Sequence, residues 1–499
     1  MENNNTHLHP LMLAGTGSDV GKSILATALC RIFKQDGFQP APFKAQNMAL
    51  NSYATQDGLE IGRAQAVQAE AAGIPCHTDM NPLLLKPSSD RTSQVVLNGR
   101  PIGNRDAYDY FRRDGREELR AAVHVSFDRL AARYNPIVME GAGSIAEINL
   151  RDTDLVNMPM ARYAQADVIL VGDIDRGGVF ASVYGSIMLQ EPADRTRIKG
   201  IIINKFRGDL RLFDEGRVML EDLCHVPVLG VIPYYTGIHI DEEDSVDLQN
   251  KHFQSVKGKV NIAVVLLRHL SNFTDFNVLE RDERVHLYYT NNTEELEKAD
   301  IILLPGTKST LEDLYELRRN GVAQAIQYAH RRGATVFGIC GGYQMMGQEV
   351  CDPDGVEGNI TRLPGLGLLP VTTTITGEKV TRQVEFYYRN MESLCRGYEI
   401  HMGRTSFVEA EEAVTVNRFL DGTAEGCCVD ERCIGTYIHG ILDNSSVIDA
   451  LLAPYSFKLT SSVAIDYECF KNEQYDKLAA HVRQYLNMPL LYQILQRND

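Results

Sequence analysis

Short apolar runs alternate with amphipathic helical stretches twice along this chain, and this pattern limits the folds open to it. In the first series the expected strands are Leu11–Ala14, Ile137–Glu140, Asp167–Ile174, Gly200–Phe206 and Pro227–Pro233. In the second series they are Asn261–Leu267, Val285–Thr290, Asp300–Pro305 and Thr335–Ile339, with one helix over Ser309–Arg332. Strands that alternate with helices are typical of a mostly parallel sheet covered on both faces. The sequence therefore predicts an α/β protein with two doubly wound domains.

A polar, charged stretch at residues 241–260 separates the two series and is expected to be a linker. We therefore expect a first domain over residues 1–240 and a second over 261–445, followed by a helical extension over 446–499. A chain of 499 residues has room for two or three domains. Its 44% hydrophobic and 23% charged residues are ordinary for a globular protein with a buried core.

Charge and cysteine content narrow the class of function. The formal net charge of −16 opposes nonspecific binding to nucleic acid, because such binding needs a basic surface. The ten cysteines include no C-x-x-C pair, so a zinc ribbon or a thioredoxin-like site is not expected. The N-terminal residues lack an apolar signal core, and no apolar run approaches the roughly 18 residues of a membrane span. We expect a cytoplasmic protein that binds neither nucleic acid nor membrane.

Residues 15–23 read GTGSDVGKS and stand between an expected strand and an amphipathic helix. They follow the phosphate-binding pattern G-x-x-x-x-G-K-[ST], with Thr16 at the first glycine position, then Gly17, Gly21, Lys22 and Ser23. In such a loop the backbone N–H groups cradle phosphate oxygens, the lysine neutralises the β- and γ-phosphates, and the serine hydroxyl ligates Mg²⁺. The alternative is a glycine-containing turn without a ligand. The strand before the loop and the helix after it favour an ATP site.

Magnesium prefers hard oxygen ligands, usually one or two carboxylates together with phosphates and water. Glu140 ends an apolar strand, where a side chain faces the ligand crevice of a parallel sheet. Asp57 is a second candidate ligand, although it also fits a turn before Gly58. Lys44 is a candidate contact to the transferred phosphate of ATP, with an ordinary surface lysine as the alternative.

Three charged residues lie at the end of another expected strand, in the sequence VGDIDRGG. Asp173 and Asp175 are candidates to ligate metal or to orient substrate. Arg176 is a candidate partner for a substrate carboxylate, because its guanidinium can form two parallel hydrogen bonds to such a group.

Residues 338–342 read GICGG at the end of the expected strand Thr335–Ile339. This is the cysteine form of the nucleophile elbow, a sharp strand-to-helix turn that exposes the nucleophile. Cys340 would lie at a helix N-terminus, which favours the reactive thiolate. The backbone N–H of Gly341 is a candidate for one half of an oxyanion hole, and Gly306, which follows another expected strand, is a candidate for the other half.

A thiol nucleophile needs a base, and His439 in IGTYIHG is the candidate. It lies far from Cys340 in sequence, which is the usual arrangement for a Cys–His pair. The alternatives are a buried structural cysteine and a hydrogen-bonded core histidine. The elbow sequence favours the catalytic interpretation of Cys340, and the pairing extends it to His439.

Several motifs resemble known families. GICGGYQMMG and YIHG are similar to the nucleophile and histidine motifs of class I glutamine amidotransferases, in their cobyric/cobyrinic acid synthase subgroup. The first domain resembles the dethiobiotin synthetase-like P-loop fold, which also has threonine at the first glycine position of its loop. Further matches, among them QNMALNSY and DIDRGGVFAS, resemble the cobyric acid branch of this subgroup and extend the likeness from residue 15 to residue 440.

This resemblance implies a reaction in cobalamin biosynthesis. ATP·Mg²⁺ would supply the energy and glutamine the nitrogen for amidation of the b, d, e and g carboxylates of adenosylcobyrinic acid a,c-diamide, a corrinoid. Cys340 would attack the glutamine amide, and His439 would transfer the proton. An acyl phosphate formed at the phosphate-binding loop would react with the released ammonia. Asn204, in NKFRGD, resembles the family's adenine-contacting asparagine.

One departure and two rival functions remain. Most class I amidotransferases have glutamate two residues after the histidine, where this chain has Ile441, and the resembling subgroup also lacks it. The group that orients His439 is therefore open, with Asp443 as a guess. A cobyrinic acid a,c-diamide synthase would share the two-domain plan but act on other carboxylates. A regulatory P-loop ATPase of the partitioning type would carry a second lysine early in the loop, and Ala14–Val20 contains none.

Overall fold

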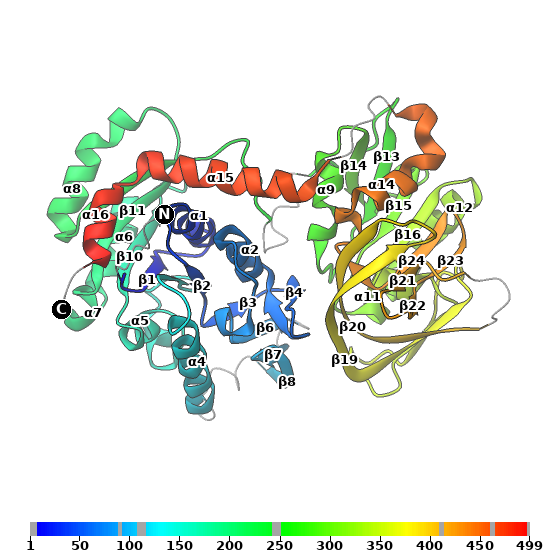
Figure 1. The fold of residues 1–499 in the computed structure, drawn as a ribbon, viewed down its shortest axis with the longest axis horizontal. Coiled ribbons are helices and arrows are strands. Elements are labelled where there is room, and N and C mark those ends of the chain that lie inside the picture. Colours follow the sequence, from blue (N-terminus) through cyan, green and yellow to red (C-terminus); the bar gives the residue numbers. More distant parts are fainter. Residues whose placement is uncertain are drawn as a thin grey trace. The chain divides into compact units, whose positions relative to one another are not determined.

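The computed structural model describes residues 7–87, 92–106, 116–241, 251–408, 414–459 and 465–496. The chain divides into two compact units (Figure 1). The first unit comprises Met1–Ala49, Ile61–Ile240 and Lys471–Asp499, and the second comprises Leu50–Glu60 and Asp241–Phe470. Residues 242–250 of the expected linker lie outside the described residues.

The first unit is built on a six-stranded parallel sheet with the strand order β12-β11-β10-β1-β9-β2. Its strands are β1 (Leu11–Gly15), β2 (Ala41–Phe43), β9 (Ile137–Glu140), β10 (Asp167–Asp173), β11 (Ile198–Phe206) and β12 (Val228–Pro233). The sequence predicted all of these except the short β2. Because helices cover both faces, the strands are buried and appear in the sequence as continuous apolar runs.

The helices of the first unit are α1 (Lys22–Gln35), α2 (Arg63–Ala72), α4 (Arg116–Ala131), α5 (Met158–Tyr163), α6 (Val179–Met188), α7 (Pro192–Arg195), α8 (Asp214–Cys224) and α16 (Met488–Leu495). Helix α15 (Tyr467–Tyr485) crosses the boundary between the units in sequence. The apolar face of α1 is buried in one core with side chains of the central sheet and of the C-terminal helices. A smaller sheet in this unit has the order β3-β6-β7-β8, formed by Gln46–Met48, Leu83–Pro87, Thr92–Leu97 and Arg100–Asp106.

The second unit contains a six-stranded sheet with the order β14-β13-β15-β16-β24-β23. Its strands are β13 (Val260–Val265), β14 (Val285–Thr290), β15 (Ile301–Leu304), β16 (Thr335–Ile339), β23 (Cys427–Asp430) and β24 (Cys433–Thr436), all parallel except β23. Its helices are α9 (Asn277–Arg281), α10 (Thr293–Leu296), α11 (Thr310–Arg319), α12 (Val322–Arg331), α13 (Gly341–Met346) and α14 (Ser445–Leu452). With two such sheets, the α/β prediction is confirmed.

A second sheet in this unit is largely antiparallel and was not predicted. Its long strands β19 (Val371–Tyr388) and β20 (Leu394–Phe407) form a hairpin, seen in yellow in Figure 1. The other strands are β17 (Glu349–Cys351), β18 (Arg362–Pro364), β21 (Asn417–Phe419), β22 (Ala424–Glu425) and β25 (Ile438–His439). Because β25 pairs with β20, this sheet holds the backbone of His439. Strands β4 (Ser52–Ala54) and β5 (Glu60–Gly62) form a separate pair.

The single helix predicted over Ser309–Arg332 is wrong. Helix α11 ends at Arg319 and α12 begins at Val322. Gly321 between them has a φ of 86°, a left-handed conformation that stops a right-handed helix and that glycine adopts without steric cost. The described part of the expected helical extension is divided between the units, with α14 in the second and α16 in the first.

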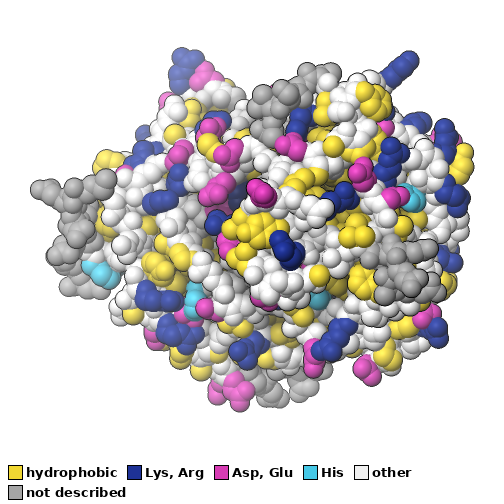
Figure 2. Space-filling view, turned by 45° about the vertical axis from the view of Figure 1, so that its right-hand side comes forward, with side chains coloured by type: hydrophobic (Ala, Val, Ile, Leu, Met, Phe, Trp, Pro, Cys, Tyr) yellow, Lys and Arg dark blue, Asp and Glu magenta, His cyan; other side chains and the backbone are white. Residues whose placement is uncertain are grey.

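The surface bears charged side chains of both signs. Figure 2 shows Lys and Arg interspersed with Asp and Glu over the face that it draws. Within the described ranges, no helix combines the length and the apolar character needed to cross a lipid bilayer. That the chain binds no nucleic acid stays a prediction.

Candidate active sites

The phosphate-binding loop lies between β1 and α1, as predicted. Gly21 has a φ of 97° and precedes the first residue of α1. A Cβ at Gly21 would lie 2.2 Å from the side-chain nitrogen of Asn204, and glycine adopts this φ without steric cost. Lys22 is buried, and its Nζ donates hydrogen bonds to the carbonyls of Gly17 (2.9 Å) and Gly143 (3.0 Å). The lysine side chain therefore lies back across the loop.

Burial lowers the pKa of Lys22 to about 8, and the ammonium of Lys44 adds to this effect, whereas Glu140 opposes it. A phosphate bound in this loop would bring negative charge and favour the protonated lysine. The buried ammonium of Lys22 therefore favours the binding of an anion, which is the property that a nucleotide-binding loop needs.

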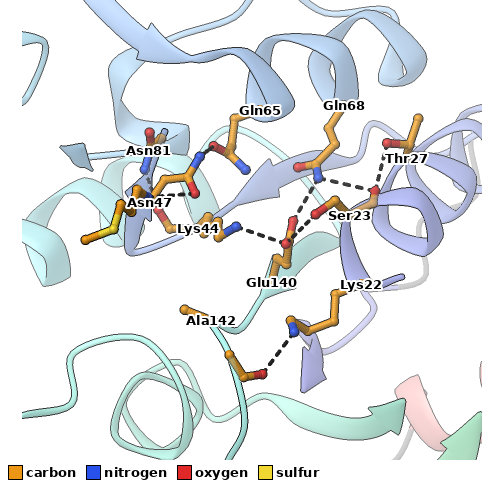
Figure 3. A network of polar contacts seen from close by, with 12 residues as sticks. Lys22, Ser23, Thr27, Lys44, Asn47, Gln65, Gln68, Asn81, Glu140 and Ala142 are labelled. Atoms are coloured by element: carbon orange, nitrogen blue, oxygen red, sulfur yellow. Dashed lines mark hydrogen bonds and ion pairs between the residues drawn. The ribbon is translucent and has the colours of Figure 1, made fainter. Parts of the chain in front are cut away.

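Glu140, at the carboxyl end of β9, is the centre of a buried polar network (Figure 3). One carboxylate oxygen accepts hydrogen bonds from Ser23 Oγ at 2.7 Å and from Lys44 Nζ at 3.0 Å, and the other accepts from Gln68 Nε2 at 3.0 Å. Burial acts to raise the pKa of Glu140, but Lys44 and the two neutral donors outweigh it, so the pKa lies below its usual value. Glu140 is thus a buried anion in contact with Ser23 at the end of the phosphate-binding loop.

A magnesium ion fits this donor set. The hydroxyl of Ser23 and the carboxylate of Glu140 are in contact, and both are hard oxygen ligands. Phosphate oxygens and water complete the coordination of Mg²⁺ in sites of this kind. The structure brings together Ser23, Lys44 and Glu140, whose roles at ATP and metal stay predictions, and it adds Gln68, which sequence analysis did not single out.

Asp57 belongs to the other unit. It is exposed in a turn closed by a hydrogen bond from the Gly58 N–H to the Thr55 carbonyl, at 3.0 Å. This is the turn position that the sequence offered as its alternative. Its role as a metal ligand stays a prediction.

The charged residues at the ends of β10 and β11 form ion pairs. Asp173 pairs with Lys205 at 3.1 Å, and Asp175 pairs with Arg207 at 2.7 Å. Arg176 is mostly exposed and lies 3.5 Å from Asp19 of the phosphate-binding loop. Both basic partners, Lys205 and Arg207, belong to the NKFRGD motif. Sequence analysis did not connect them with Asp173 or Asp175.

Asn204 lies beside the phosphate-binding loop. Its side-chain nitrogen donates to the carbonyl of Val20 at 2.9 Å, and the residue is buried. This bond fixes the loop immediately before Gly21. Thr16 is at the start of the loop, where its backbone N–H donates to Val171 at 3.0 Å. The proposed contact of Asn204 with adenine stays a prediction.

Cys340 has the backbone of a nucleophile elbow. It lies between β16 and α13 with a φ of 52° and a ψ of −110°, a strained conformation for a residue other than glycine. The flanking glycines allow the turn to pack tightly: a side chain at Gly342 would lie 2.0 Å from the carbonyl oxygen of Leu304. Cys340 is buried, with its Sγ 3.6 Å from the carbonyl of Ile400.

His439 is fully buried and is held by Asp275. Its Nδ1 donates to one carboxylate oxygen of Asp275 at 2.7 Å, and the other oxygen accepts from the backbone N–H of Gly440 at 2.9 Å. Its Nε2 has no hydrogen-bond partner among the residues that the structure describes. This leaves Nε2 as the ring nitrogen available for proton transfer.

Electrostatics favour a charged imidazole. Burial opposes the charge, but the Asp275 carboxylate and the interaction with Cys340 outweigh it and raise the pKa of His439 to about 10. A positively charged neighbour stabilises a thiolate. The arrangement therefore favours an imidazolium at His439.

The guess that Asp443 orients His439 is wrong, because Asp275 makes that hydrogen bond. Asp275 lies in the short helix Phe273–Phe276, between Thr274 and a buried phenylalanine. The one sequence signal for a role of Asp275 was that an acidic residue occurs in an otherwise buried segment. Nothing in the sequence linked it to a histidine 164 residues away.

The two glycines considered for the oxyanion hole lie close to this site. A side chain at Gly306 would come within 3.0 Å of the His439 ring. A side chain at Gly341 would come within 3.0 Å of the backbone nitrogen of Thr307. The loop after β15 thus lies against both the elbow and the histidine, so its backbone is near the point where a tetrahedral intermediate would form.

Comparisons with known proteins agree with the two kinds of domain in this chain. The family description "CobQ/CobB/MinD/ParA nucleotide binding domain" matches residues 11–248, and "CobB/CobQ-like glutamine amidotransferase domain" matches residues 261–447. The cobyric acid synthase of Phocaeicola vulgatus is 74% identical over 493 residues, which cover 99% of each chain. That of Bacteroides fragilis is 74% identical over 99% of this chain and 100% of its own. That of Syntrophobacter fumaroxidans is 47% identical over 97% of this chain and 98% of its own.

Proposed function

This chain belongs to the cobyric acid synthase family, and from that premise we propose how its two sites divide one reaction. The chain is an ATP-dependent, glutamine-hydrolysing amidating enzyme of cobalamin biosynthesis. Its proposed substrate is adenosylcobyrinic acid a,c-diamide, and the proposed products of its four turnovers are the b, d, e and g amides. The partners are then small molecules, and the ten free cysteines together with the use of ATP support a cytoplasmic location.

The second unit would release ammonia from glutamine. The Cys340 thiolate attacks the amide carbon, and the backbone N–H groups of Gly306 and Gly341 stabilise the oxyanion. His439 donates the proton that the departing ammonia needs. This leaves a glutamyl thioester on Cys340. Water then attacks the thioester carbonyl while His439 accepts its proton, and glutamate and the thiolate are restored.

The first unit would activate the acceptor carboxylate. A carboxylate oxygen of the corrinoid attacks the γ-phosphorus of ATP, and the bond to the β-phosphate bridging oxygen breaks. Lys22 neutralises the phosphates, and Thr16 and Gly17 belong to the backbone cradle. Ser23 and Glu140 would hold Mg²⁺, which offsets the negative charge that develops on the phosphates. Ammonia then attacks the acyl phosphate, and phosphate leaves.

Several further residues are proposed to bind substrate. Lys44 would contact the transferred phosphate once it exchanges its bond to Glu140. Asp173, Asp175 and Arg176 lie at and just after the carboxyl end of β10, the neighbour of β1, where a corrinoid carboxylate would approach. Their ion pairs supply both signs of charge in this region.

The observation that carries the proposal is the buried Asp275–His439 pair beside a strained Cys340, in the same chain as a phosphate-binding loop. A mass-spectrometric time course with the a,c-diamide, glutamine and ATP would test it. Four successive replacements of OH by NH₂ are expected. No product from this substrate would refute the proposal and favour a synthase that acts on the a and c carboxylates.

A variant separates the two half-reactions. Cys340→Ala should abolish amidation from glutamine and leave amidation from ammonia intact, because only the first needs the thiolate. Product formation from each nitrogen source is measured separately. If the variant still used glutamine, Cys340 would not be the nucleophile.

A further inference from the structure

The segment Leu50–Glu60 belongs to the second unit, although the chain on both sides of it belongs to the first. Before the segment comes Lys44, and after it comes Gln68, and both side chains bond to Glu140 of the nucleotide site. A short piece of chain between two parts of the ATP-binding machinery is therefore built into the unit that carries Cys340 and His439.

Asn51 and Asn272 join this segment to the loop before Asp275. The backbone N–H of Asn272 donates to Oδ1 of Asn51 at 2.6 Å. In return, the backbone N–H of Ser52 donates to Oδ1 of Asn272 at 3.0 Å. Both asparagines are buried, so each bond is made away from water, where losing it leaves an unsatisfied N–H group.

The same loop links Asn51 to His439 through Asp275. Asn272 has a φ of 53°, a left-handed conformation that asparagine tolerates better than most residues, and it caps the short helix that carries Asp275. The backbone N–H of Asp275 donates to the Asn272 carbonyl at 3.1 Å. The Asp275 carboxylate then binds both His439 and Gly440. Three consecutive hydrogen bonds thus lead from Asn51 to Nδ1 of His439.

Tyr53 reaches the same histidine by a second route. Its ring lies 4.6 Å from that of Tyr398, centroid to centroid, and the Tyr398 ring is stacked on His439 at 5.3 Å. Ala54 packs against Tyr398 and Ile400, and the carbonyl of Ile400 faces the Cys340 sulfur. The segment therefore supports the imidazole both at Nδ1 and on the face of its ring.

Other bonds attach the segment through residues other than Asn51 and Tyr53. Glu60 forms a buried ion pair with Lys379 of β19. Gln383, also on β19, donates from its side chain to the carbonyl of Ala54 at 3.0 Å. These bonds hold the segment in place but involve neither Asn51 nor Tyr53, so they provide a matched control.

We propose that Leu50–Glu60 is a positioning element of the glutaminase site, in which Asn51 and Tyr53 fix His439 through Asp275 and Tyr398. This inference rests on the proposed function. The glutamine-hydrolysing site is then not complete within the C-terminal half of the chain. It needs a segment that is anchored at both ends in the nucleotide-binding unit.

The test measures glutamate release from glutamine by the full-length enzyme. Asn51→Ala and Tyr53→Leu should each lower kcat by about tenfold, the effect of losing one well-placed contact, with little change in KM for glutamine. The alkaline fall in glutaminase activity should also move to lower pH by about one unit, because a displaced Asp275 no longer holds the proton on His439. Ammonia-dependent amidation should be unchanged, which shows that the variants are folded.

Two variants serve as controls. Gln383→Ala removes an attachment of the same segment, and Tyr53→Phe keeps the ring, so both should retain most of the wild-type glutaminase activity. Equal losses in Asn51→Ala and Gln383→Ala would show a merely structural role and overturn the proposal. So would wild-type kcat and pH dependence in both Asn51→Ala and Tyr53→Leu. A wild-type enzyme that could not use glutamine at all would instead refute the proposed function.

Discussion

Replacing Asp275 with asparagine should almost abolish glutamine hydrolysis. Asp275 uses both oxygens, one for His439 Nδ1 and one for the backbone N–H of Gly440. Asparagine has one oxygen, and the Gly440 N–H can only donate, so the oxygen stays with Gly440 and the NH₂ group faces Nδ1. Nδ1 must then be an acceptor, the proton moves to Nε2, and His439 can no longer take the proton of Cys340.

The size of the expected loss in kcat follows from the electrostatic interaction between Asp275 and His439. A rise in the pKa of His439 from 6.5 to about 10 corresponds to a preference for the imidazolium of about 5 kcal/mol. The Asp275 carboxylate provides most of the favourable part. Losing the charge and the correct tautomer together should lower the glutaminase kcat by roughly a thousandfold.

The assay compares glutamate release by Asp275→Asn and Asp443→Asn. Only the first should fail, and both should retain ammonia-dependent amidation. An Asp275→Asn enzyme with activity within a few-fold of wild type would refute the reasoning, and so would an equal loss in Asp443→Asn.

The pH dependence of stability supplies a second test. Because the folded-state pKa of His439 is raised, its contribution is complete below about pH 6.5 and is lost as the pH rises towards 10. Denaturant unfolding at several pH values should show this loss in wild type and not in Asp275→Asn.

Two further substitutions probe the loop and the elbow. Lys22→Ala should abolish amidation with either nitrogen source while sparing glutaminase activity, because the buried ammonium at the phosphate loop is lost. Amidation at the wild-type rate would place the ATP site elsewhere. Gly342→Ala should lower the free energy of unfolding by about 2–4 kcal/mol, because the new methyl group would lie 2.0 Å from the Leu304 carbonyl oxygen. Calorimetry measures this change, and an unchanged Tm would show that the elbow relaxes without cost.

The buried parallel strands could be predicted from the sequence because they are continuous apolar runs with clear ends. The predicted strands Ile137–Glu140 and Thr335–Ile339 have the same bounds in the structure. Residues that follow such strands face the ligand-binding edge of the sheet. This is why Glu140 and Cys340 could be predicted as site residues from the sequence alone.

The long hairpin β19–β20 could not be predicted by the same signal. Its strands are partly exposed, and β19 carries many threonines and charged residues between its buried positions. In a half-buried strand of this kind, apolar and polar residues alternate instead of forming a continuous apolar run. In β19 this alternation is interrupted where the pairing register shifts between Ile375 and Val380. The sheet that holds the backbone of His439 was therefore missed, although the histidine itself was chosen.

Contacts between residues far apart in the sequence could not be predicted for a different reason. Gln68 is 72 residues from Glu140, Asp275 is 164 residues from His439, and Asn51 is 221 residues from Asn272. Local motifs indicate the conformation and chemistry of a short stretch of sequence. They do not report which remote side chain completes a hydrogen bond, because that depends on how the elements pack.

The position two residues after the histidine shows how the fold settles the question left by the missing glutamate. Ile441 is fully buried at the start of the 3₁₀ turn Ile441–Asp443, directly after the left-handed Gly440. A carboxylate at Ile441 would be buried among apolar side chains of the core, where an unpaired charge is costly. Asp275 approaches the ring instead and binds the Gly440 N–H with its second oxygen, so a single acid both orients the imidazole and secures the turn that removes Ile441 from the site. The absent glutamate is thus matched by an acid from another loop, and the position of that loop depends on its bonds to Asn51 and Ser52.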